Sequence, residues 1–344
     1  MVLGKRGFRR PAAGVGVRAR ASCRAGVRTC TSLAIALVLP AGCEQAPVQQ
    51  ETAAPARTGP TRSVALTFDD LPGVYVDTTT AHMRDVNERL IASLTRAGVH
   101  ATGFVNENKL RGEAGRAALL DLWLDAGLDL GNHTWGHPDL HRIPLDEFED
   151  AVLRGEVVTR ERMAARGLAP RFFRHPFLHT GRDTATRNGL ERFLAQHGYR
   201  VAPVTIDNYD FQWARAYDRA HERGDSAAAH DIGDRYVAYM DTVFGFYEAQ
   251  SRAFFGREPA QVLLLHVNRL NADRVDDLLA MMRRRDYAIV PLDRALEDPV
   301  YQSRDDFTGP AGISWLHRWA LTAGTPGSAF AGEPAMPPEI ENAR

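Results

Sequence analysis

Two short motifs of this chain combine side chains that bind metals or transfer protons. Asp69 and Asp70 are adjacent and are followed at once by a turn sequence, Leu71-Pro72-Gly73. Neighbouring side chains of a regular strand point to opposite faces, so two adjacent carboxylates converge only where the chain leaves the strand. His133 and His137 are four residues apart, a spacing that one helical turn brings to the same face. Taken alone, the Asp pair also fits a solvated turn and the His pair an incidental one.

Three further motifs carry polar residues after apolar runs. They are Arg174-His175-Pro176-Phe177, Asp207-Asn208-Tyr209-Asp210-Phe211 and Leu263-Leu264-Leu265-His266. Each is weak by itself, because a His that ends an apolar strand is usually a partly buried structural residue. His141 repeats the spacing of four but lies beyond Pro138, which ends the helical turn, so we leave it out. The sequence does not place His175 and His179.

Short apolar runs alternate with helical patterns and indicate the elements that position these motifs. Strands are expected at 63–68, 101–105, 128–132, 171–174, 199–206, 261–266 and 287–290, and helices at 81–97, 114–126, 146–166 and 184–197. This order predicts an α/β fold, a distorted (β/α) barrel of about seven parallel strands. Each polar motif follows a predicted strand, which is where such barrels place active sites.

The regions outside the barrel differ in composition. We expect an export signal at 1–43, a flexible tether at 44–62, the barrel at 63–298, a C-terminal extension at 299–324 and a disordered tail at 325–344. A helical insertion at about 211–258 carries an apolar stripe, which fits either a helix packed on the barrel wall or a lid over the substrate. Trp315 and Trp319, four apart, fit helix packing better than glycan binding.

The first 42 residues have the pattern of an export signal. They contain eight basic residues and no acidic one, followed by an apolar run from Ser32 to Pro40 that is too short for a permanent membrane span. The run ends in Leu39-Pro40-Ala41-Gly42-Cys43, which resembles a bacterial lipobox except that Pro40 stands where an aliphatic residue is usual. We therefore expect an exported lipoprotein, attached to a membrane of the bacterial cell envelope or periplasm through a lipidated Cys43.

The cysteine content limits the residues that can bind a metal, and the net charge limits the classes of binding partner. The only cysteines are Cys23, Cys30 and Cys43, so a metal in the barrel must be held by His, Asp or Glu. Without residues 1–42 the chain has 34 basic and 43 acidic residues, a formal charge of −9. Nucleic acid is therefore not an expected partner, whereas a neutral or cationic glycan fits. The oligomeric state stays open.

All five motifs together resemble those of the NodB-homology polysaccharide deacetylases, carbohydrate esterase family 4. The matching residues are Thr67-Phe68-Asp69-Asp70, His133-x-x-x-His137, Arg174-x-Pro176-Phe177, Asp207-x-x-Asp210-Phe211 and Leu263-x-Leu265-His266, in the family's order. The resemblance runs from about Val64 to Asp293.

The resemblance implies a role for each matching position. The divalent metal, Zn²⁺ first with Co²⁺, Ni²⁺ or Mn²⁺ as alternatives, would be held by Asp70, His133 and His137, a ligand set suited to first-row cations. Asp69 would be the general base, oriented and kept ionised by Arg174. His266 would be the general acid, with Asp210 raising its pKa and fixing its orientation.

The substrate-binding residues are less well determined. Phe177, Phe211 and Leu265 are expected to line the pocket for a small acyl group. Trp135 fits either stacking on a sugar ring or packing beside the metal loop. Phe211 stands where the family usually has tryptophan, which leaves the acyl group and the sugar open.

The implied function is hydrolysis of a linear amide: removal of an N-linked acetyl group from an amino-sugar glycan such as a polysaccharide, peptidoglycan or chito-oligosaccharide. Two alternatives remain. One is an amino-sugar deformylase or another amidase of the same fold. The other is a non-catalytic glycan-binding lipoprotein, against which the presence of every polar motif position argues.

Overall fold

The computed structural model describes residues 60–75 and 77–341. These residues form a sheet of seven parallel strands in the order β5-β4-β3-β2-β1-β6, with β7 paired to the start of β1. The central strands are apolar runs buried on both faces, as expected of a parallel sheet covered by helices. The strands are β1 Arg62–Leu71, β2 Ala101–Val105, β3 Asp129–Asn132, β4 Phe172–Phe173, β5 Arg200–Val201, β6 Gln261–His266 and β7 Tyr287–Ile289.

Residues 200–206 join the two edges of this sheet. The Ala202 amide donates to the Phe173 carbonyl in β4, whereas the Ile206 amide donates to the Val262 carbonyl in β6, at 2.8 and 3.0 Å. The predicted strand at 199–206 is thus divided between β5 and a bridge from Ile206 to Leu263. The sheet closes on itself through this segment, which confirms the predicted distorted (β/α) barrel.

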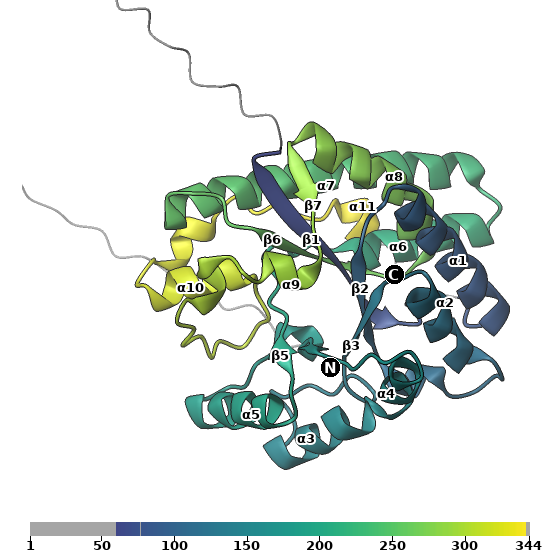
Figure 1. Ribbon diagram of the computed structural model, residues 1–344. Helices are drawn as coiled ribbons and strands as arrows, with labels where there is room; N and C mark the ends of the chain where they lie inside the picture. Colours follow the sequence, from purple (N-terminus) through teal and green to yellow (C-terminus); the bar gives the residue numbers. More distant parts are fainter. Residues whose placement is uncertain (1–59, 76, 342–344) are drawn as a thin grey trace, which may run out of the picture. The chain divides into compact units, whose positions relative to one another are not determined.

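Helices surround the strands (Figure 1). Several begin at a side-chain cap: Thr79, Asp183 and Asn268 each accept a hydrogen bond from the amide three residues on. The elements on the barrel are α1 Thr80–Arg96, η1 Glu107–Leu110, η2 Arg116–Ala118, α2 Leu119–Asp125, α3 Leu145–Arg154, α4 Val157–Ala164, η3 Pro176–Leu178, α5 Thr184–Gln196, α8 Arg269–Arg284 and α9 Leu292–Ala295.

The helix predicted at 146–166 is in fact two helices, α3 and α4, which break at Gly155. A Cβ on Gly155 would lie 2.3 Å from the carbonyl carbon of Thr134, so only glycine lets the two backbones approach this closely. The Trp135 amide donates to the Ala151 carbonyl of α3 at 2.8 Å. The break therefore lets the loop that carries His133 and His137 pack against the end of α3.

The predicted insertion forms two helices, α6 Asp210–Glu222 and α7 Ser226–Phe255. The apolar stripe of α7, which includes Tyr236, Met240, Phe244 and Tyr247, is buried in the main hydrophobic core. Of the two interpretations of this stripe, the structure has the helix packed on the barrel wall. In Figure 1 α7 runs along the upper edge of the molecule, beside α8.

The C-terminal region packs against the barrel. It comprises η4 Pro299–Gln302, α10 Trp315–Thr322, η5 Gly327–Phe330 and α11 Pro338–Glu341. Trp315 and Trp319 are buried, as helix packing predicts. The prediction of a disordered tail is wrong for residues 325–341, because Ile340 is buried and the Tyr247 hydroxyl donates to Glu333 at 2.9 Å. The composition of this tail indicates that it cannot form a core of its own. It does not indicate that the tail can pack on the apolar surface of α6 and α7.

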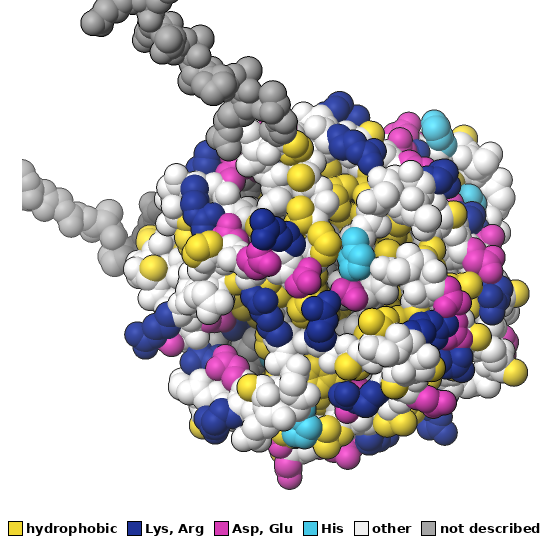
Figure 2. Space-filling view, viewed as in Figure 1, with side chains coloured by type: hydrophobic (Ala, Val, Ile, Leu, Met, Phe, Trp, Pro, Cys, Tyr) yellow, Lys and Arg dark blue, Asp and Glu magenta, His cyan; other side chains and the backbone are white. Residues whose placement is uncertain are grey.

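The predicted export signal at 1–43 and the tether up to residue 59 lie outside the described residues. Within the described part of the chain, no helix has the length and apolarity needed to cross a membrane. On the face seen in Figure 2, basic side chains alternate with acidic ones, and no extended area of one sign is visible.

Candidate active site

The polar motifs meet at one end of the barrel, where they line a cavity of about 290 Å³. The motifs reach this place because the carboxyl ends of parallel strands lie at the same end of a barrel. The residues lining the cavity are Asp69, Asp70, Val74, His133, His137, His175, Phe177, Leu178, Asp207, Asn208, Tyr209, Phe211, Leu264, His266 and Gly312.

The two aspartates converge through a distortion of β1. The strand does not end at Phe68 as predicted but continues to Leu71, and its register with β2 shifts between Phe68 and Leu71. Asp70 has a φ of 66°, in the left-handed region that costs energy for a non-glycine residue. This bulge, together with the turn that follows, places both carboxylates at the cavity.

Asp70, His133 and His137 form a group that can hold a metal ion, since one potential ligand atom from each lies within 4.8 Å of the others. His137 also has a left-handed φ, of 54°. The His133 Nδ1 lies 2.8 Å from the Arg174 carbonyl, to which it donates, and this leaves Nε2 free as a ligand. Burial lowers the pKa of both histidines, so they are neutral at pH 7 as ligands must be.

Asp70 is kept ionised by positive charge around it. Burial raises the pKa of its carboxyl, but Lys109 and the neighbouring histidines outweigh this effect and hold the pKa well below its usual range. The Lys109 ammonium lies 3.2 Å from Asp70 Oδ2. The donor set of two neutral imidazoles and one carboxylate fits a first-row divalent cation such as zinc.

Asp69 is almost fully buried beside Arg174. The Arg174 guanidinium lies 3.4 Å from both carboxylate oxygens and also donates to the Thr67 hydroxyl and the Ala202 carbonyl at 2.9 Å. Burial raises the pKa of Asp69 to about 6, while the charges of Arg174 and His266 oppose that rise. Asp69 is therefore ionised at pH 7 yet basic enough to accept a proton.

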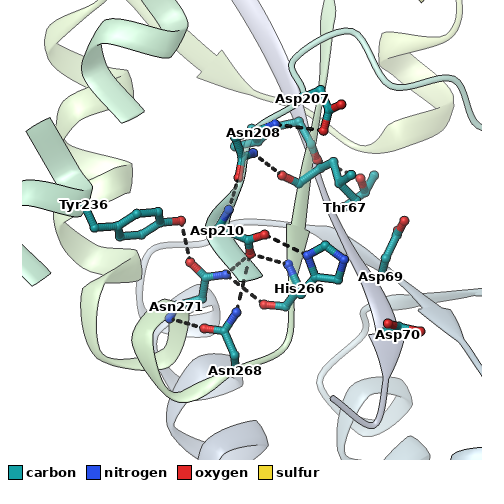
Figure 3. A network of polar contacts seen from close by, with 12 residues as sticks. Thr67, Asp69, Asp70, Asp207, Asn208, Asp210, Tyr236, His266, Asn268 and Asn271 are labelled. Atoms are coloured by element: carbon teal, nitrogen blue, oxygen red, sulfur yellow. Dashed lines mark hydrogen bonds and ion pairs between the residues drawn. The ribbon is translucent and has the colours of Figure 1, made fainter. Parts of the chain in front are cut away.

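His266 and Asp210 form the opposite side of the site. Asp210 Oδ1 accepts from His266 Nδ1 at 2.7 Å, while Oδ2 accepts from the His266 amide at 2.7 Å and from Asn271 Nδ2 at 2.6 Å. The Tyr236 hydroxyl donates to Asn271 Oδ1 at 2.7 Å and extends this network into the core (Figure 3). Burial lowers the pKa of His266, but Asp210 more than compensates and brings it to about 9.

Aromatic side chains form much of the cavity wall. Phe177 packs against His137 with ring centroids 4.4 Å apart, and Phe211 packs against His266 at 5.8 Å. Phe177 is 52% exposed and Tyr209 41%, so both stand at the rim of the cavity. Phe177 also has a left-handed φ, of 56°.

Two predicted substrate-binding residues are not in the cavity wall. Leu265 is fully buried in the core, and Leu264 lines the cavity instead. The cause is the alternation along β6, in which Leu264 shares a face with His266 and Leu265 points to the other. Trp135 does not line the cavity either, and the guanidinium groups of Arg111 and Arg154 lie over its ring at 5.6 and 5.1 Å.

Several residues at the site were not predicted as site residues. Asp207, Tyr209 and Gly312 line the cavity. A Cβ on Gly312 would lie 1.9 Å from the Phe177 carbonyl oxygen, so this glycine lets the C-terminal extension close one side of the site. The alternation along β6 would have identified Leu264, and Asp207 and Tyr209 belong to a motif already singled out. No local signal marks Lys109 or Gly312.

Known proteins share sequence similarity with this region. A family model described as polysaccharide deacetylase matches residues 56–202. A peptidoglycan-N-acetylglucosamine deacetylase of Bacillus cereus is 31% identical over 156 residues, 44% of this chain and 48% of that protein. A chitooligosaccharide deacetylase of a Bradyrhizobium species is 35% identical over 155 residues, 45% of this chain and 60% of that protein. The chain thus spans about half the length of these curated relatives.

Among solved structures, a peptidoglycan deacetylase of Bacillus subtilis is similar with a TM-score of 0.44 and 20% identity, over 69% of this chain and 90% of that one. The sequence match spans the motifs of Asp69, Asp70, His133, His137 and Arg174. Over this region, the chain is similar in sequence to the polysaccharide deacetylase family.

Proposed function

We propose that the protein is a metal-dependent hydrolase that removes the N-linked acetyl group from an amino-sugar-containing glycan. The observation that carries this proposal is the pairing of Asp69 with Arg174 and of His266 with Asp210 on two sides of the Asp70, His133 and His137 group. The activities of the relatives, deacetylation of peptidoglycan and of chito-oligosaccharide, agree with it.

In this proposal Asp70, His133 and His137 hold the metal, and zinc fits their chemistry best. When bound, such an ion polarises the amide carbonyl and makes water more acidic. The two imidazoles are neutral and the carboxylate is ionised, which are the protonation states that metal binding requires.

Asp69 is the general base of the proposed reaction. Its carboxylate takes a proton from the water molecule as the water oxygen bonds to the amide carbon. A carboxyl group with a pKa of about 6 is mostly ionised at neutral pH and is a stronger base than an exposed aspartate. Arg174 is fixed by its bonds to Thr67 and Ala202, so it holds the Asp69 side chain in one place.

His266 is the general acid. An amine anion is a very poor leaving group, so the nitrogen must receive a proton as the carbon–nitrogen bond breaks. With Nδ1 bound to Asp210, the imidazolium has Nε2 free to donate this proton. The products are acetate and a free amine, and a pKa of about 9 keeps the acid protonated at neutral pH.

The cavity wall sets the size of the acyl group. Phe177, Phe211 and Leu264 place apolar surface beside the polar centre, which fits a methyl group. Phe211 stands where the family usually has tryptophan. Its smaller side chain covers less of the cavity wall beside His266.

The test is an assay of the purified full chain loaded with Zn²⁺ on N-acetylated chitin oligomers, peptidoglycan and acetylated exopolysaccharides. We expect acetate and free amine to appear in equal amounts on at least one substrate. Release of formate in place of acetate would replace the proposal by the deformylase alternative. If no substrate is cleaved with Zn²⁺, Co²⁺, Mn²⁺ or Ni²⁺, the glycan-binding alternative is favoured.

We also propose that the protein is exported and lipidated at Cys43, on the basis of the residues before that cysteine. Mass spectrometry of the mature N-terminus in a bacterial host should find a lipid-modified Cys43, and Cys43→Ala should release the protein from the membrane fraction. An unmodified N-terminus upstream of Cys43 would contradict this.

A further inference from the structure

A second group of metal-binding side chains lies outside the proposed catalytic centre. Asp139 and His141 follow the His133–His137 motif, and His179 follows η3 in the loop that carries Arg174 and Phe177. One potential ligand atom from each of the three lies within 4.8 Å of the others. All three side chains are half-buried.

The ligand atoms are close enough for an ion, but side chains must rotate to point at it. Zinc bonds of about 2.0–2.2 Å in a tetrahedron place ligand atoms roughly 3.3 Å apart. Asp139 Oδ1 and His179 Nδ1 are 2.7 Å apart in a hydrogen bond, which an ion between them would replace. The His141 and His179 rings are stacked, with centroids 3.8 Å apart and planes 6° apart, so one ring must tilt for both to point at the same ion.

His141 is free to make that rotation. Neither of its ring nitrogens makes a hydrogen bond of normal geometry, although both are buried and the Pro310 carbonyl lies nearby. Burial costs such an imidazole its hydrogen bonds to water, and a bond from a ring nitrogen to a metal ion would compensate for that loss. Tilting this ring therefore breaks no hydrogen bond of normal geometry, only the looser contact with the Pro310 carbonyl.

Two positive side chains oppose a cation here. Arg142 lies 3.2 Å from Asp139 Oδ2, and the charge of Arg182 acts on His141. Arg142 is 84% exposed, so an ion can displace it at little cost. Removal of the Arg142 charge should accordingly strengthen cation binding.

The position of the group suggests what an ion would do. Asp139 and His141 belong to the loop that holds His133 and His137, whereas His179 belongs to the loop that holds Arg174 and Phe177. The Phe177 ring contacts both His137 and His179, with ring centroids 4.4 and 5.7 Å apart. An ion bound by all three residues would link these two loops and restrict the movement of Phe177 at the rim of the cavity.

We propose that Asp139, His141 and His179 form a second site for a first-row divalent cation, with Zn²⁺ as the best fit, that ties the two loops of the active site together. The proposal does not depend on the reaction catalysed, because it concerns ion binding alone.

The test counts Zn²⁺ ions per full-length chain by elemental analysis and calorimetry after chelator treatment and reloading with Zn²⁺. The double variant His141→Gln/His179→Gln should bind one ion fewer than the wild type, and His133→Gln/His137→Gln should also bind one fewer. Combining all four changes should remove two. Addition of Zn²⁺ should raise the Tm of His133→Gln/His137→Gln but not that of the fourfold variant.

Three controls keep the result interpretable. His197→Gln/His230→Gln removes two exposed histidines elsewhere and should bind as many ions as the wild type. If the double variant does not fold by circular dichroism, Asp139→Asn should weaken the second binding event by at least the roughly 10- to 100-fold that outer-shell partners control. Arg142→Ala should tighten that event.

The proposal is overturned if His141→Gln/His179→Gln or, in its place, Asp139→Asn binds Zn²⁺ as the wild type does. Loss of an ion from the exposed-histidine control would likewise identify the extra binding as non-specific. If His133→Gln/His137→Gln binds as many Zn²⁺ ions as the wild type while His141→Gln/His179→Gln binds one fewer, the catalytic metal site is contradicted and the second site is supported.

Discussion

The two sides of the active site hold their ionisable groups in opposite ways. On one side, Asp69 faces a single buried guanidinium at 3.4 Å, and its Oδ1 makes no hydrogen bond of normal geometry. On the other side, both oxygens of Asp210 accept short bonds, from the ring and the amide of His266 and from Asn271. The Asp69 carboxylate therefore accepts few hydrogen bonds, whereas the Asp210 carboxylate accepts hydrogen bonds at both oxygens.

This difference matches the two tasks. A base must gain a proton during the reaction, and a carboxylate saturated with donors would resist protonation. The partner of an acid must stay charged and fixed while the acid loses its proton, which a dense network achieves. In the proposed reaction the same residue type therefore has two roles, because burial raises the pKa of Asp69 whereas hydrogen bonds fix the position of Asp210.

Asp69→Asn should give the largest effect, because it removes the base with almost no change in shape. We expect kcat to fall by roughly 10²- to 10⁴-fold. Steady-state kinetics on an active substrate measure this, with the Tm as a control for folding. Activity within a few-fold of the wild type would exclude Asp69 as the base.

Asp210→Asn should have the next largest effect, on rate and on pH dependence together. The neutral amide no longer favours the His266 imidazolium, a loss of about 1.5–3 kcal/mol for a hydrogen bond to a charged group. We expect the alkaline limb of the kcat/KM profile to move down by roughly one pH unit or more. An unmoved limb would show that Asp210 has only a structural role.

Asn271→Ala weakens the network that holds Asp210. It removes a donor to Asp210 Oδ2 and leaves the Tyr236 hydroxyl without its acceptor. We expect the free energy of unfolding to fall by about 1–3 kcal/mol, with a smaller loss of kcat than for Asp210→Asn. Urea unfolding and kinetics on the same preparation compare the two quantities.

Tyr236→Phe should have the smallest effect, because it removes only the hydroxyl at the far end of the network (Figure 3). The expected loss of stability is about 1 kcal/mol, with kcat close to that of the wild type. A loss of kcat as large as that of Asn271→Ala would mean that the network acts as a single unit.

The sequence predicted the framework of the site because its signals are local. Apolar runs mark buried strands, and the motifs of Asp69, His133 and His266 follow three of them. The error at Leu265 was avoidable, because the period of two along β6 places Leu264 on the face of His266.

Other features depend on distant packing and leave no local mark. The positions of Trp135 beside two arginines, and of Gly312 against Phe177, result from segments brought together by the fold. The same holds for the second histidine group, since Pro138 separates His141 from the first pair and His179 lies on another loop.

The central claim is that Asp69 acts as base and His266 as acid. The most direct measurement is the pH profile of kcat/KM for the metal-loaded enzyme. Activity should rise as Asp69 loses its proton near pH 6 and fall as His266 loses its own near pH 9. In Asp210→Asn the alkaline limb should move to lower pH, and by more than the acidic limb, because the Asp210 charge acts strongly on His266 and only weakly on Asp69. A profile with a single limb, or an acidic limb that moves as far as the alkaline one in this variant, would contradict the assignment.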